Sequence, residues 1–508
     1  MKDSHAVISY AEKLFKAADT LRKNIDAAEY KHPILGLIFL KYISDVFEER
    51  KQELIQLKDE GADPEEKSEY WSANVFWVPK DARWSKIKDA AKNPNIGTII
   101  DDAMYALEEE NDSLKGVLPK DYGSPKLDKS NLGKLVDLFS NISVGGTQHE
   151  TRDILGRIYE YFLGQFASNE GKKGGQFYTP SVIVNILVQM ISPKKGRVYE
   201  PCSGSGGMIV QSEQFMKENN GELSFYGQES NQTTWRLCKM NLAIRGIDAD
   251  VKWNNEGSFV RDEHRELKAD YILANPPFND GDWSGEQLTE DPRWKYGIPP
   301  TSNANFAWMQ HIIHHLSSKG IGGCVMSNGA LNSDKNNEDV IRKEITKADL
   351  VDCIVLLPSK LFYSVSLSAT LWFFAKNKKT KHRDRRNHTL FIDARKMGQM
   401  LPGSKTHRII TPDEIKHIAK TYHAWKGEPD AGIYKDKIGF CKDVALKEIE
   451  SENYILDSSV YVGYEEKKSS ASYQKTMKEL SKQYSDCISK SNSIDKENRT
   501  NLKELGFI

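Results

Sequence analysis

The sequence contains little cysteine, and its few cysteines are not arranged to form a bridge or to bind a metal. No two of them form a C-x-x-C pair, and they follow no regular spacing. A disulfide framework and a zinc site both depend on such spacings, so neither is predicted. A reducing, cytoplasmic compartment fits this usage best. The six cysteines are Cys202, Cys238, Cys324, Cys353, Cys441 and Cys487.

The sequence also lacks an excess of charge of either sign. Its 71 lysines and arginines nearly balance 72 aspartates and glutamates, which leaves a formal net charge of -1. A strongly basic field drives salt-sensitive binding to duplex nucleic acid, and this chain as a whole does not have one. If the chain acts on DNA, we expect a partner to supply part of the affinity.

Long apolar runs and nucleotide-motor motifs are missing as well. The strongest apolar run, Ile34–Leu40, is too short to span a bilayer, and Met1–His5 lacks the basic and apolar regions of a secretory signal. The sequence has no G-x-x-x-x-G-K-[ST] loop and no internal repeat. We therefore expect no membrane contact and no nucleotide-driven motor in this chain.

The 508 residues are enough for two or three domains, because a single core rarely grows beyond about 250–300 residues. Apolar residues recur at three- and four-residue steps near the N-terminus, which predicts amphipathic helices. They are Ile8, Ala11, Leu14, Phe15, Ala18 and Leu21, then Leu37, Leu40, Ile43 and Phe47. Loop signals at Gly123–Pro125 and Gly145–Gly146 end this pattern, so residues 1–145 are predicted to form an all-α domain.

Residues 146–425 are predicted to form a second domain, in which short apolar runs alternate with helical stretches. Alternation of this kind predicts βαβ units, a mainly parallel sheet and an α/β fold class. Two runs, 369–375 and 389–393, flank a basic segment and are predicted to close the sheet as an antiparallel hairpin. The other expected strands are 197–200, 223–228, 250–253, 269–274, 321–327 and 350–357.

Residues 426–508 are predicted to form an irregular C-terminal region that ends in a charged helix. Apolar side chains share one face of that helix, which therefore needs a partner. The partner is either the helical domain of this chain or another subunit. The stripe consists of Tyr473, Met477, Leu480, Tyr484 and Ile488.

A glycine-rich turn follows the first expected strand. Glu200 leads through Pro201 and Cys202 into the segment Ser203–Gly207, and a helix is predicted from Met208. Glycines let the backbone approach a ligand closely and let strand and helix pack tightly. The spacing G-S-G-G suits a pyrophosphate poorly, and taken alone a tight turn without a ligand explains it equally well.

An acidic residue, Glu229, follows the second expected strand. A carboxylate at this point of a doubly wound sheet can accept hydrogen bonds from both hydroxyls of a ribose. An exposed acid at the positive end of a helix is the alternative. The glycine turn followed by this acid favours a bound nucleoside over either alternative.

The most specific pattern is the buried run Tyr271–Ala274 followed by Asn275-Pro276-Pro277-Phe278. Prolines end the strand, so the carbonyls of Asn275 and Pro276 are held in place. Adenine N6 is a poor nucleophile because its lone pair is delocalised into the ring. The Asn275 side-chain oxygen and the Pro276 carbonyl can draw its hydrogens, with Phe278 stacked on the base. Because N6 is hidden in a duplex, the nucleotide would be extruded; an ordinary strand-ending turn is the alternative.

With these residues the sequence resembles the amino-methyltransferases, in particular the modification subunits of type I restriction-modification systems. Gly175–Pro180 is similar to the family's G-x-F-Y-T-P segment, and further matches at Leu40–Asp45, Asn305–Trp308 and Leu357–Phe362 extend the resemblance over nearly the whole chain. The resemblance implies a Rossmann-like methyltransferase core, S-adenosyl-L-methionine as cofactor and site-specific transfer to adenine N6 of DNA. It implies Asn275, Pro276, Pro277 and Phe278 as catalytic residues, and Gln176, Phe177, Tyr178, Thr179, Glu200, Pro201, Ser203, Gly204, Ser205, Gly206, Gly207, Glu229 and Asn275 as cofactor-binding residues.

The resemblance also implies partners: DNA, a specificity subunit that reads the site, a second copy of this chain and a motor-nuclease subunit. Fewer than about 100 residues remain outside the helical segment and the core, too few for a sequence-reading domain of usual size. The family's first motif commonly begins with Asp, and Glu200 keeps the same charge. Glu256 lies one position before the acid that often contacts the cofactor adenine, so its role stays open.

Two other functions stay open. Methylation of a protein glutamine or of an RNA amino group uses the same tetrapeptide pattern, although Phe177–Pro180 and the helical N-terminus favour DNA adenine. The second is a catalytically silent subunit that binds the cofactor only to stabilise a complex. Intact Asn275, Pro276 and Phe278 argue against this function.

Three lesser features have simpler explanations. His311, His314 and His315 have no second pair of ligands, so a solvated or partly packed helix is predicted there in place of a metal site. Lys376–Arg386 fits either contacts with DNA phosphates or a solvated tip. Gly171–Gly175 is predicted to be a loop that becomes ordered when cofactor or DNA binds.

Overall fold

The computed structural model describes residues 2–22, 25–141, 148–170, 178–362, 368–401, 407–464 and 473–504. The chain divides into two units, Met1–Val462 and Gly463–Ile508. The predicted loop Gly171–Gly175 and two predicted cofactor residues, Gln176 and Phe177, lie outside the described residues. Among the helices of the described part, none combines the length and the apolar character that a membrane crossing needs.

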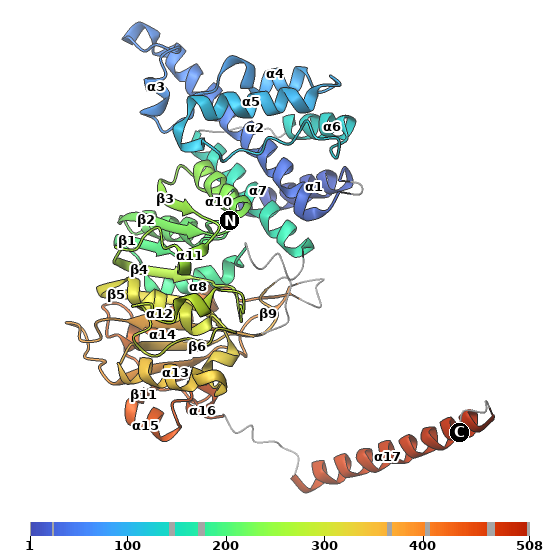
Figure 1. The fold of residues 1–508 in the computed structure, drawn as a ribbon, viewed down its shortest axis with the longest axis vertical. Helices are drawn as coiled ribbons and strands as arrows, with labels where there is room; N and C mark the ends of the chain where they lie inside the picture. The colour runs from blue at the N-terminus through green and yellow to red at the C-terminus, as the bar shows by residue number, and fades with distance from the viewer. Residues whose placement is uncertain are drawn as a thin grey trace. The chain divides into compact units, whose positions relative to one another are not determined.

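The N-terminal part is helical, as predicted (Figure 1). Helix α2 is apolar on nearly all sides and is buried along most of its length, which makes it the centre of this part. Of the residues expected on the apolar face of the first helix, Ala11, Leu14, Phe15 and Ala18 are buried. The helices are α1 (Lys2–Thr20), α2 (Ala27–Gln56), α3 (Ser68–Trp71), α4 (Trp84–Asp89), α5 (Ile96–Glu110), α6 (Lys129–Ser140) and α7 (Gln148–Asn169).

Helix α7 packs in the same core as the N-terminal helices, although its residues fall in the predicted second domain. Phe15 of α1 meets Phe162 and Phe166 of α7 edge to face, with ring centroids 5.1 and 5.2 Å apart. The Lys31 ammonium also forms a buried ion pair at 2.8 Å with Glu170, just after α7. The division into residues 1–145, 146–425 and 426–508 stays a prediction.

The second part contains a nine-stranded sheet in the order β11-β8-β6-β7-β5-β4-β1-β2-β3, in which only β7 and β11 run against the others. This confirms the predicted α/β fold class with a mainly parallel sheet. A separate two-stranded sheet pairs β9 (Gln399–Met400) with β10 (Arg408–Ile409). The main strands are β1 (Lys195–Glu200), β2 (Glu222–Glu229), β3 (Ala249–Trp253), β4 (Ala269–Ala274), β5 (Leu316–Ser327), β6 (Val351–Leu356), β7 (Ala369–Ala375), β8 (His388–Asp393) and β11 (Cys441–Ala445).

Helices cover both faces of this sheet, because successive strand side chains point to opposite faces. Val198 packs with α8, α9, α10 and α14 in one core, whereas Tyr199 packs with α12 and α13 in the other. The covering helices are α8 (Ser181–Ile191), α9 (Gly207–Glu218), α10 (Gln232–Ile244), α11 (Gly257–Val260), α12 (Asn305–His315), α13 (Glu338–Lys347) and α14 (Pro412–Trp425).

The predicted hairpin between residues 369–375 and 389–393 is wrong in its pairing. Strand β7 is antiparallel, as expected, but it lies between β5 and β6, and β6 separates it from β8. Strand β8 runs parallel to β6. All seven residues of β7 are buried, and a strand that is apolar on both faces is stable only with neighbours on each side.

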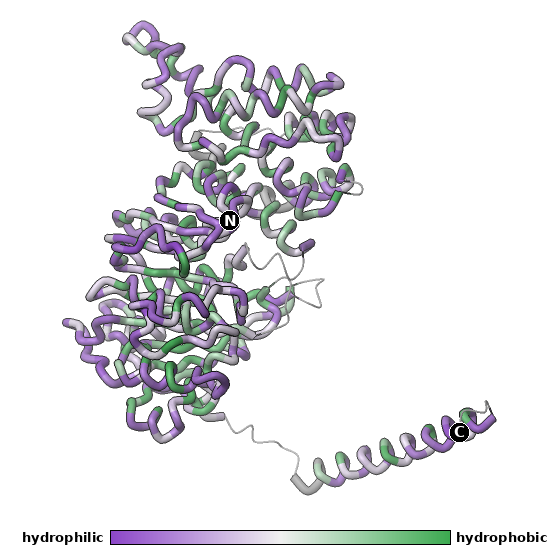
Figure 2. The backbone as a smooth tube through the Cα atoms, in the orientation of Figure 1, coloured by the Kyte–Doolittle hydropathy of each residue, from purple (hydrophilic) through white to green (hydrophobic). Residues whose placement is uncertain are grey.

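The region after residue 425 is more regular than predicted. It contains β11, α15 (Leu446–Ser451) and α16 (Ser458–Tyr461), which complete one end of the sheet. The predicted C-terminal helix is present as α17 (Tyr473–Glu504), along which hydrophilic and hydrophobic stretches alternate (Figure 2). Of its predicted stripe, Met477, Leu480, Tyr484 and Ile488 are all exposed.

Candidate active site

The sheet brings the predicted site residues to one edge. Strands β4, β1 and β2 are parallel neighbours, so their carboxyl ends meet. These ends are Ala274 before the proline tetrapeptide, Glu200 before the glycine turn, and Glu229. Ligands of open α/β sheets bind at this edge, in the crevice outside the carboxyl ends of the strands.

The glycine turn between β1 and α9 is held in place by hydrogen bonds to β2 and α10. The Ser203 N–H donates to the Gln228 carbonyl at 2.9 Å, and the Asn241 amide donates to the Ser205 carbonyl at 2.7 Å. Gly204 and Gly206 have φ of +52° and +77°, which few residues other than glycine adopt. Pro201, Ser203 and Ser205 are buried, and Gly207 begins α9.

Glu229 holds this turn from the neighbouring strand. Its two carboxylate oxygens accept hydrogen bonds from the Gly204 and Asn231 N–H groups, both at 2.9 Å. Burial raises the pKa of this carboxyl, and the backbone donors partly offset that effect. The Ser230 N–H and hydroxyl also act on this carboxylate and lower its pKa.

Glu200 is the buried acid at the end of β1. Its side chain is only 3% exposed, and its Oε2 atom has no hydrogen-bond partner within the described residues. Burial and the nearby charge of Glu229 raise the pKa of Glu200 well above its usual range. An unpartnered carboxyl oxygen in a buried site is costly, so this atom is suited to a cationic donor from a ligand.

The amide of Asn275 is oriented by Thr179. Asn275 Nδ2 donates to Thr179 Oγ1 at 2.9 Å, although the two residues are 96 positions apart. Its nitrogen is thereby engaged, and its oxygen, Oδ1, is left to accept hydrogen bonds from elsewhere. Tyr178 and Thr179 are both half-buried just before α8.

The rest of the tetrapeptide is fixed by residues that follow it. Pro276 is buried and Pro277 is exposed. The half-buried ring of Phe278 meets Phe362 edge to face, with centroids 6.0 Å apart. Asn279, in the left-handed region at φ +53°, exchanges two hydrogen bonds with the buried Asn305 of α12, at 3.0 and 2.9 Å.

Two families match this chain, one for each part. The N-6 DNA Methylase family matches residues 150–470, and the HsdM N-terminal domain matches residues 10–139. The methylase subunit of the type I restriction enzyme HindI from Haemophilus influenzae is 40% identical over 85% of this chain and 100% of its own length. The MjaIX methylase subunit from Methanocaldococcus jannaschii is 36% identical over 98% and 92%.

The chain belongs to the N-6 DNA methylase family. The resemblance to type I modification subunits is therefore confirmed, and with it the assignment as an adenine-specific DNA methyltransferase. A solved type I methyltransferase subunit from Streptococcus thermophilus has the same fold, with a TM-score of 0.74 at 23% identity over 90% of this chain and 99% of its own.

Two asparagines that shape this methylase site were not predicted as site residues. Asn254, buried after β3, accepts hydrogen bonds from the Glu256 and Gly257 N–H groups at 3.0 and 2.8 Å and so forms the turn. The Glu256 side chain itself is exposed. Asn305 fixes the segment after Phe278, and an asparagine at the start of an apolar helix was the available sign of it.

Gly206 of the methylase turn is expected to tolerate no side chain. A Cβ atom there would lie 2.8 Å from the Cys238 sulfur, and φ is +77°. We expect Gly206→Ala to lower the free energy of unfolding by about 2 kcal/mol in a urea titration. Gly207→Ala is the matched control, because a Cβ at Gly207 meets no atom within 4 Å. Equal losses in the two variants would contradict this account.

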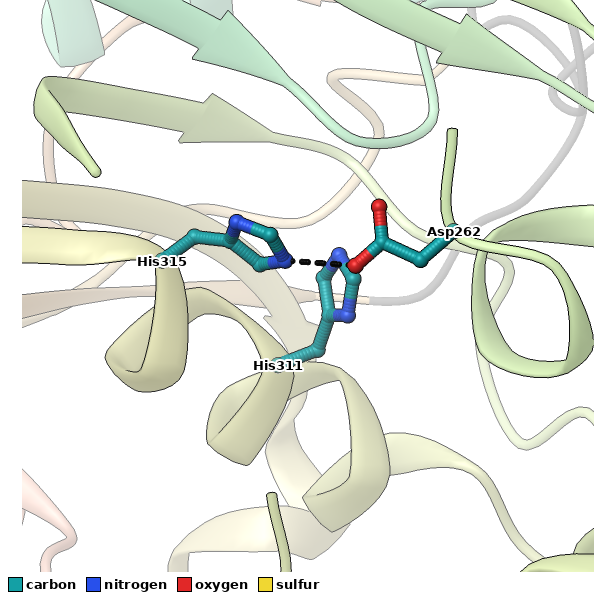
Figure 3. Close-up of side chains that lie close together, drawn as sticks. All are labelled: Asp262, His311 and His315. Atoms are coloured by element: carbon teal, nitrogen blue, oxygen red, sulfur yellow. Dashed lines mark hydrogen bonds and ion pairs between the residues drawn. The ribbon is translucent and has the colours of Figure 1, made fainter. Parts of the chain in front are cut away.

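The histidines of α12 are more buried than predicted. Asp262, His311 and His315 lie together (Figure 3), with possible ligand atoms all within 4.8 Å of one another. Both ring nitrogens of His315 are engaged, Nδ1 by the Leu267 carbonyl at 2.9 Å and Nε2 by the Asp262 carboxylate at 2.8 Å. Arg293 donates to His311 Nδ1 at 3.0 Å, which leaves the proton on Nε2. Three of the four ring nitrogens of His311 and His315 are therefore already engaged by groups of the protein.

The basic segment Lys376–Arg386 is largely paired with acids of the methylase itself. Arg385 lies against Asp352 at 3.2 Å, and both side chains are almost fully buried. Lys378 forms an ion pair with Asp349, and Arg383 with Asp443, both at 2.6 Å. Lys378, Arg383 and Arg385 are therefore structural, whereas Lys376, Lys379 and Lys381 are exposed, as a solvated tip predicts.

Proposed function

We propose that this methylase transfers the methyl group of S-adenosyl-L-methionine to adenine N6, with Asn275, Pro276 and Phe278 holding the base. The hydrogen bond from Asn275 to Thr179 is the observation that carries the proposal, because it leaves Asn275 Oδ1 as an acceptor. This oxygen and the Pro276 carbonyl would accept the two N6 hydrogens and localise the lone pair. Phe278 would stack on the extruded base.

The residues at the strand ends fit the expected cofactor. The unpartnered oxygen of Glu200 suits the amino group of the methionine part, and Gly204, at φ +52°, lets the cofactor approach the backbone of the turn closely. Glu229, at the end of β2, would accept hydrogen bonds from the ribose hydroxyls. When bound, S-adenosyl-L-methionine supplies an electrophilic methyl on its sulfonium. Tyr178 and Thr179 precede the helix that covers this edge, and Gln176 and Phe177 stay predictions from the resemblance.

We further infer that the chain works in a complex, in the cytoplasm. The proposed partners are a specificity subunit, a second copy of this chain and a motor-nuclease subunit. A net charge of -1 supports shared binding of DNA. The stripe Met477, Leu480, Tyr484 and Ile488 of α17 is exposed by 43–70% and suits a helix of a partner subunit.

Product analysis tests the proposed reaction. The full chain, co-purified from its native cell with its partners, is incubated with methyl-labelled S-adenosyl-L-methionine and with DNA, RNA or protein. We expect label in N6-methyladenine of DNA, and loss of this base from genomic DNA when the gene is deleted. Label in RNA or in protein glutamine, with none in DNA, would overturn the proposal. Cofactor binding without any transfer would favour the silent assembly subunit.

A positioning role of Thr179 gives a separate prediction. We expect Thr179→Val to lower the rate of methyl transfer by about tenfold, because the Asn275 amide loses its fixed orientation. Cofactor affinity should change less than the rate, and Thr179→Ser, which keeps the hydroxyl, should restore most of the activity. Single-turnover transfer and calorimetry measure the two quantities. An inactive Ser variant would exclude the hydroxyl as the reason.

A further inference from the structure

A cavity of about 530 Å³ lies at the edge of the sheet opposite the candidate active site. Its wall includes Lys268, which precedes β4, Leu316, which begins β5, and Lys376, which follows the antiparallel β7. Asn275 follows the other end of β4. The cavity and the tetrapeptide are therefore separated by the length of a six-residue strand, roughly 20 Å.

The charge in this cavity is positive and largely uncompensated. Its cationic lining residues are Lys268, Arg293, Lys295 and Lys376, and no Asp or Glu is among its described lining residues. Arg293 is neutralised by Asp291, with hydrogen bonds of 2.7 and 2.6 Å. Lys268, Lys295 and Lys376 form no ion pair within the described part of the chain. Lys268 Nζ donates only to a carbonyl, that of His314, at 2.8 Å.

The three lysines are close enough to affect one another. Burial and the charge of Lys295 both lower the pKa of Lys376, and Lys268 adds to the effect. Burial also lowers the pKa of Lys268, and Lys295 adds to this, although Glu266 and Asp262 act in the opposite direction. His314 adds no charge near neutral pH, because burial and Lys268 lower its pKa to about 4. An anion between the lysines would relieve this repulsion.

The remaining lining residues suit a small ligand with polar and apolar parts. Ser317 and Ser318 offer hydroxyl groups beside the lysines. Tyr296, Ile313 and Leu316 supply apolar wall. A concave site of this volume encloses a small molecule, whereas a nucleic acid backbone is followed by an extended groove.

We propose that this cavity binds a small polyphosphate anion, of the kind carried by a nucleoside triphosphate or by inorganic tripolyphosphate. Three or four negative charges match the three lysines without a carboxylate partner, and ammonium–phosphate hydrogen bonds are charge-assisted. This binding function is distinct from methyl transfer and lies at the other edge of the sheet.

Calorimetry on the full chain tests the proposal, with tripolyphosphate, ATP and adenosine as probes. We expect saturable binding of tripolyphosphate and of ATP, and no binding of adenosine alone. Tighter binding of ATP than of tripolyphosphate would identify a nucleotide as the ligand, and the reverse would identify the inorganic anion. The double variant Lys295→Ala/Lys376→Ala should weaken binding at least about tenfold. Both residues are accessible to solvent, although the Lys376 ammonium is partly buried, so the fold is expected to persist, and thermal unfolding checks this.

The double variant Lys379→Ala/Lys381→Ala is the matched control, because it removes the same charge from exposed positions outside the cavity. It should bind as the unchanged chain does. Equal binding by both double variants, or no saturable binding of either phosphate probe, would overturn the proposal. A single-stranded oligonucleotide that binds, and loses affinity only in the cavity variant while the small anions do not bind, would reassign the site to nucleic acid.

Discussion

Asn275→Ala is expected to reduce the rate of methyl transfer by at least about a thousandfold, because the side-chain acceptor for the N6 hydrogens is lost. Cofactor affinity should stay within about tenfold, since the lost contacts are mainly to the base. Single-turnover transfer of labelled methyl to DNA by the assembled complex measures the rate, and calorimetry measures cofactor binding. A variant that methylates at the normal rate would exclude the proposed role of Asn275.

Two further variants separate this role from a structural one. Asn275→Asp keeps an oxygen acceptor, and the Thr179 hydroxyl can donate to it, so part of the activity should return. Asn219→Ala removes the same amide from an exposed position at the end of α9 and should leave transfer unchanged. Loss of activity in the Asp variant equal to that in the Ala variant would favour a packing role over an acceptor role.

The predictable strands are those whose own sequence indicates that they are buried. Runs such as Tyr271–Ala274 are apolar over consecutive residues, as strands covered on both faces must be. The pairing of β7 could not be predicted in this way, because it depends on neighbours far along the chain. The nearly continuous apolar run Ala369–Ala375, which is buried throughout, nevertheless indicated a strand inside the sheet and not one at its edge.

Strand β11 was missed for the opposite reason. Cys441–Ala445 forms the edge of the sheet, and two of its five residues, Cys441 and Val444, are buried. An edge strand needs no continuous apolar run, so its composition resembles that of a loop. Its place is fixed by pairing with β8, whose apolar run the sequence did show.

In the candidate site, too, the features that local sequence encodes were predictable and the contacts between distant residues were not. Glu200, Glu229 and Asn275 could be placed from the sequence, because each lies at the end of a recognisable strand and parallel strands end at one edge. The contact of Thr179 with Asn275 joins residues 96 positions apart. It follows from how α8 packs on the sheet, and no local pattern encodes it.

Glu200→Gln is expected to weaken binding of S-adenosyl-L-methionine by about 100-fold at alkaline pH, because a buried charge-assisted hydrogen bond is replaced by a neutral one. The pH dependence should also change. Burial and Glu229 raise the pKa of Glu200, so the carboxyl keeps its proton above its usual range. The cofactor's ammonium favours the carboxylate, so binding must release that proton.

Affinity for the cofactor should rise with pH until the raised pKa of Glu200 is passed, and should then level off. Glu229 titrates with Glu200 as a coupled pair, but its backbone donors from Gly204 and Asn231 partly offset its burial, so Glu200 is expected to hold the proton. Calorimetry in buffers of different ionisation enthalpy measures the released proton. The proton release should vanish in Glu200→Gln. It should persist in the control Glu222→Gln, which removes an exposed acid at the far end of β2. A proton release unchanged by Glu200→Gln would assign the titration to Glu229.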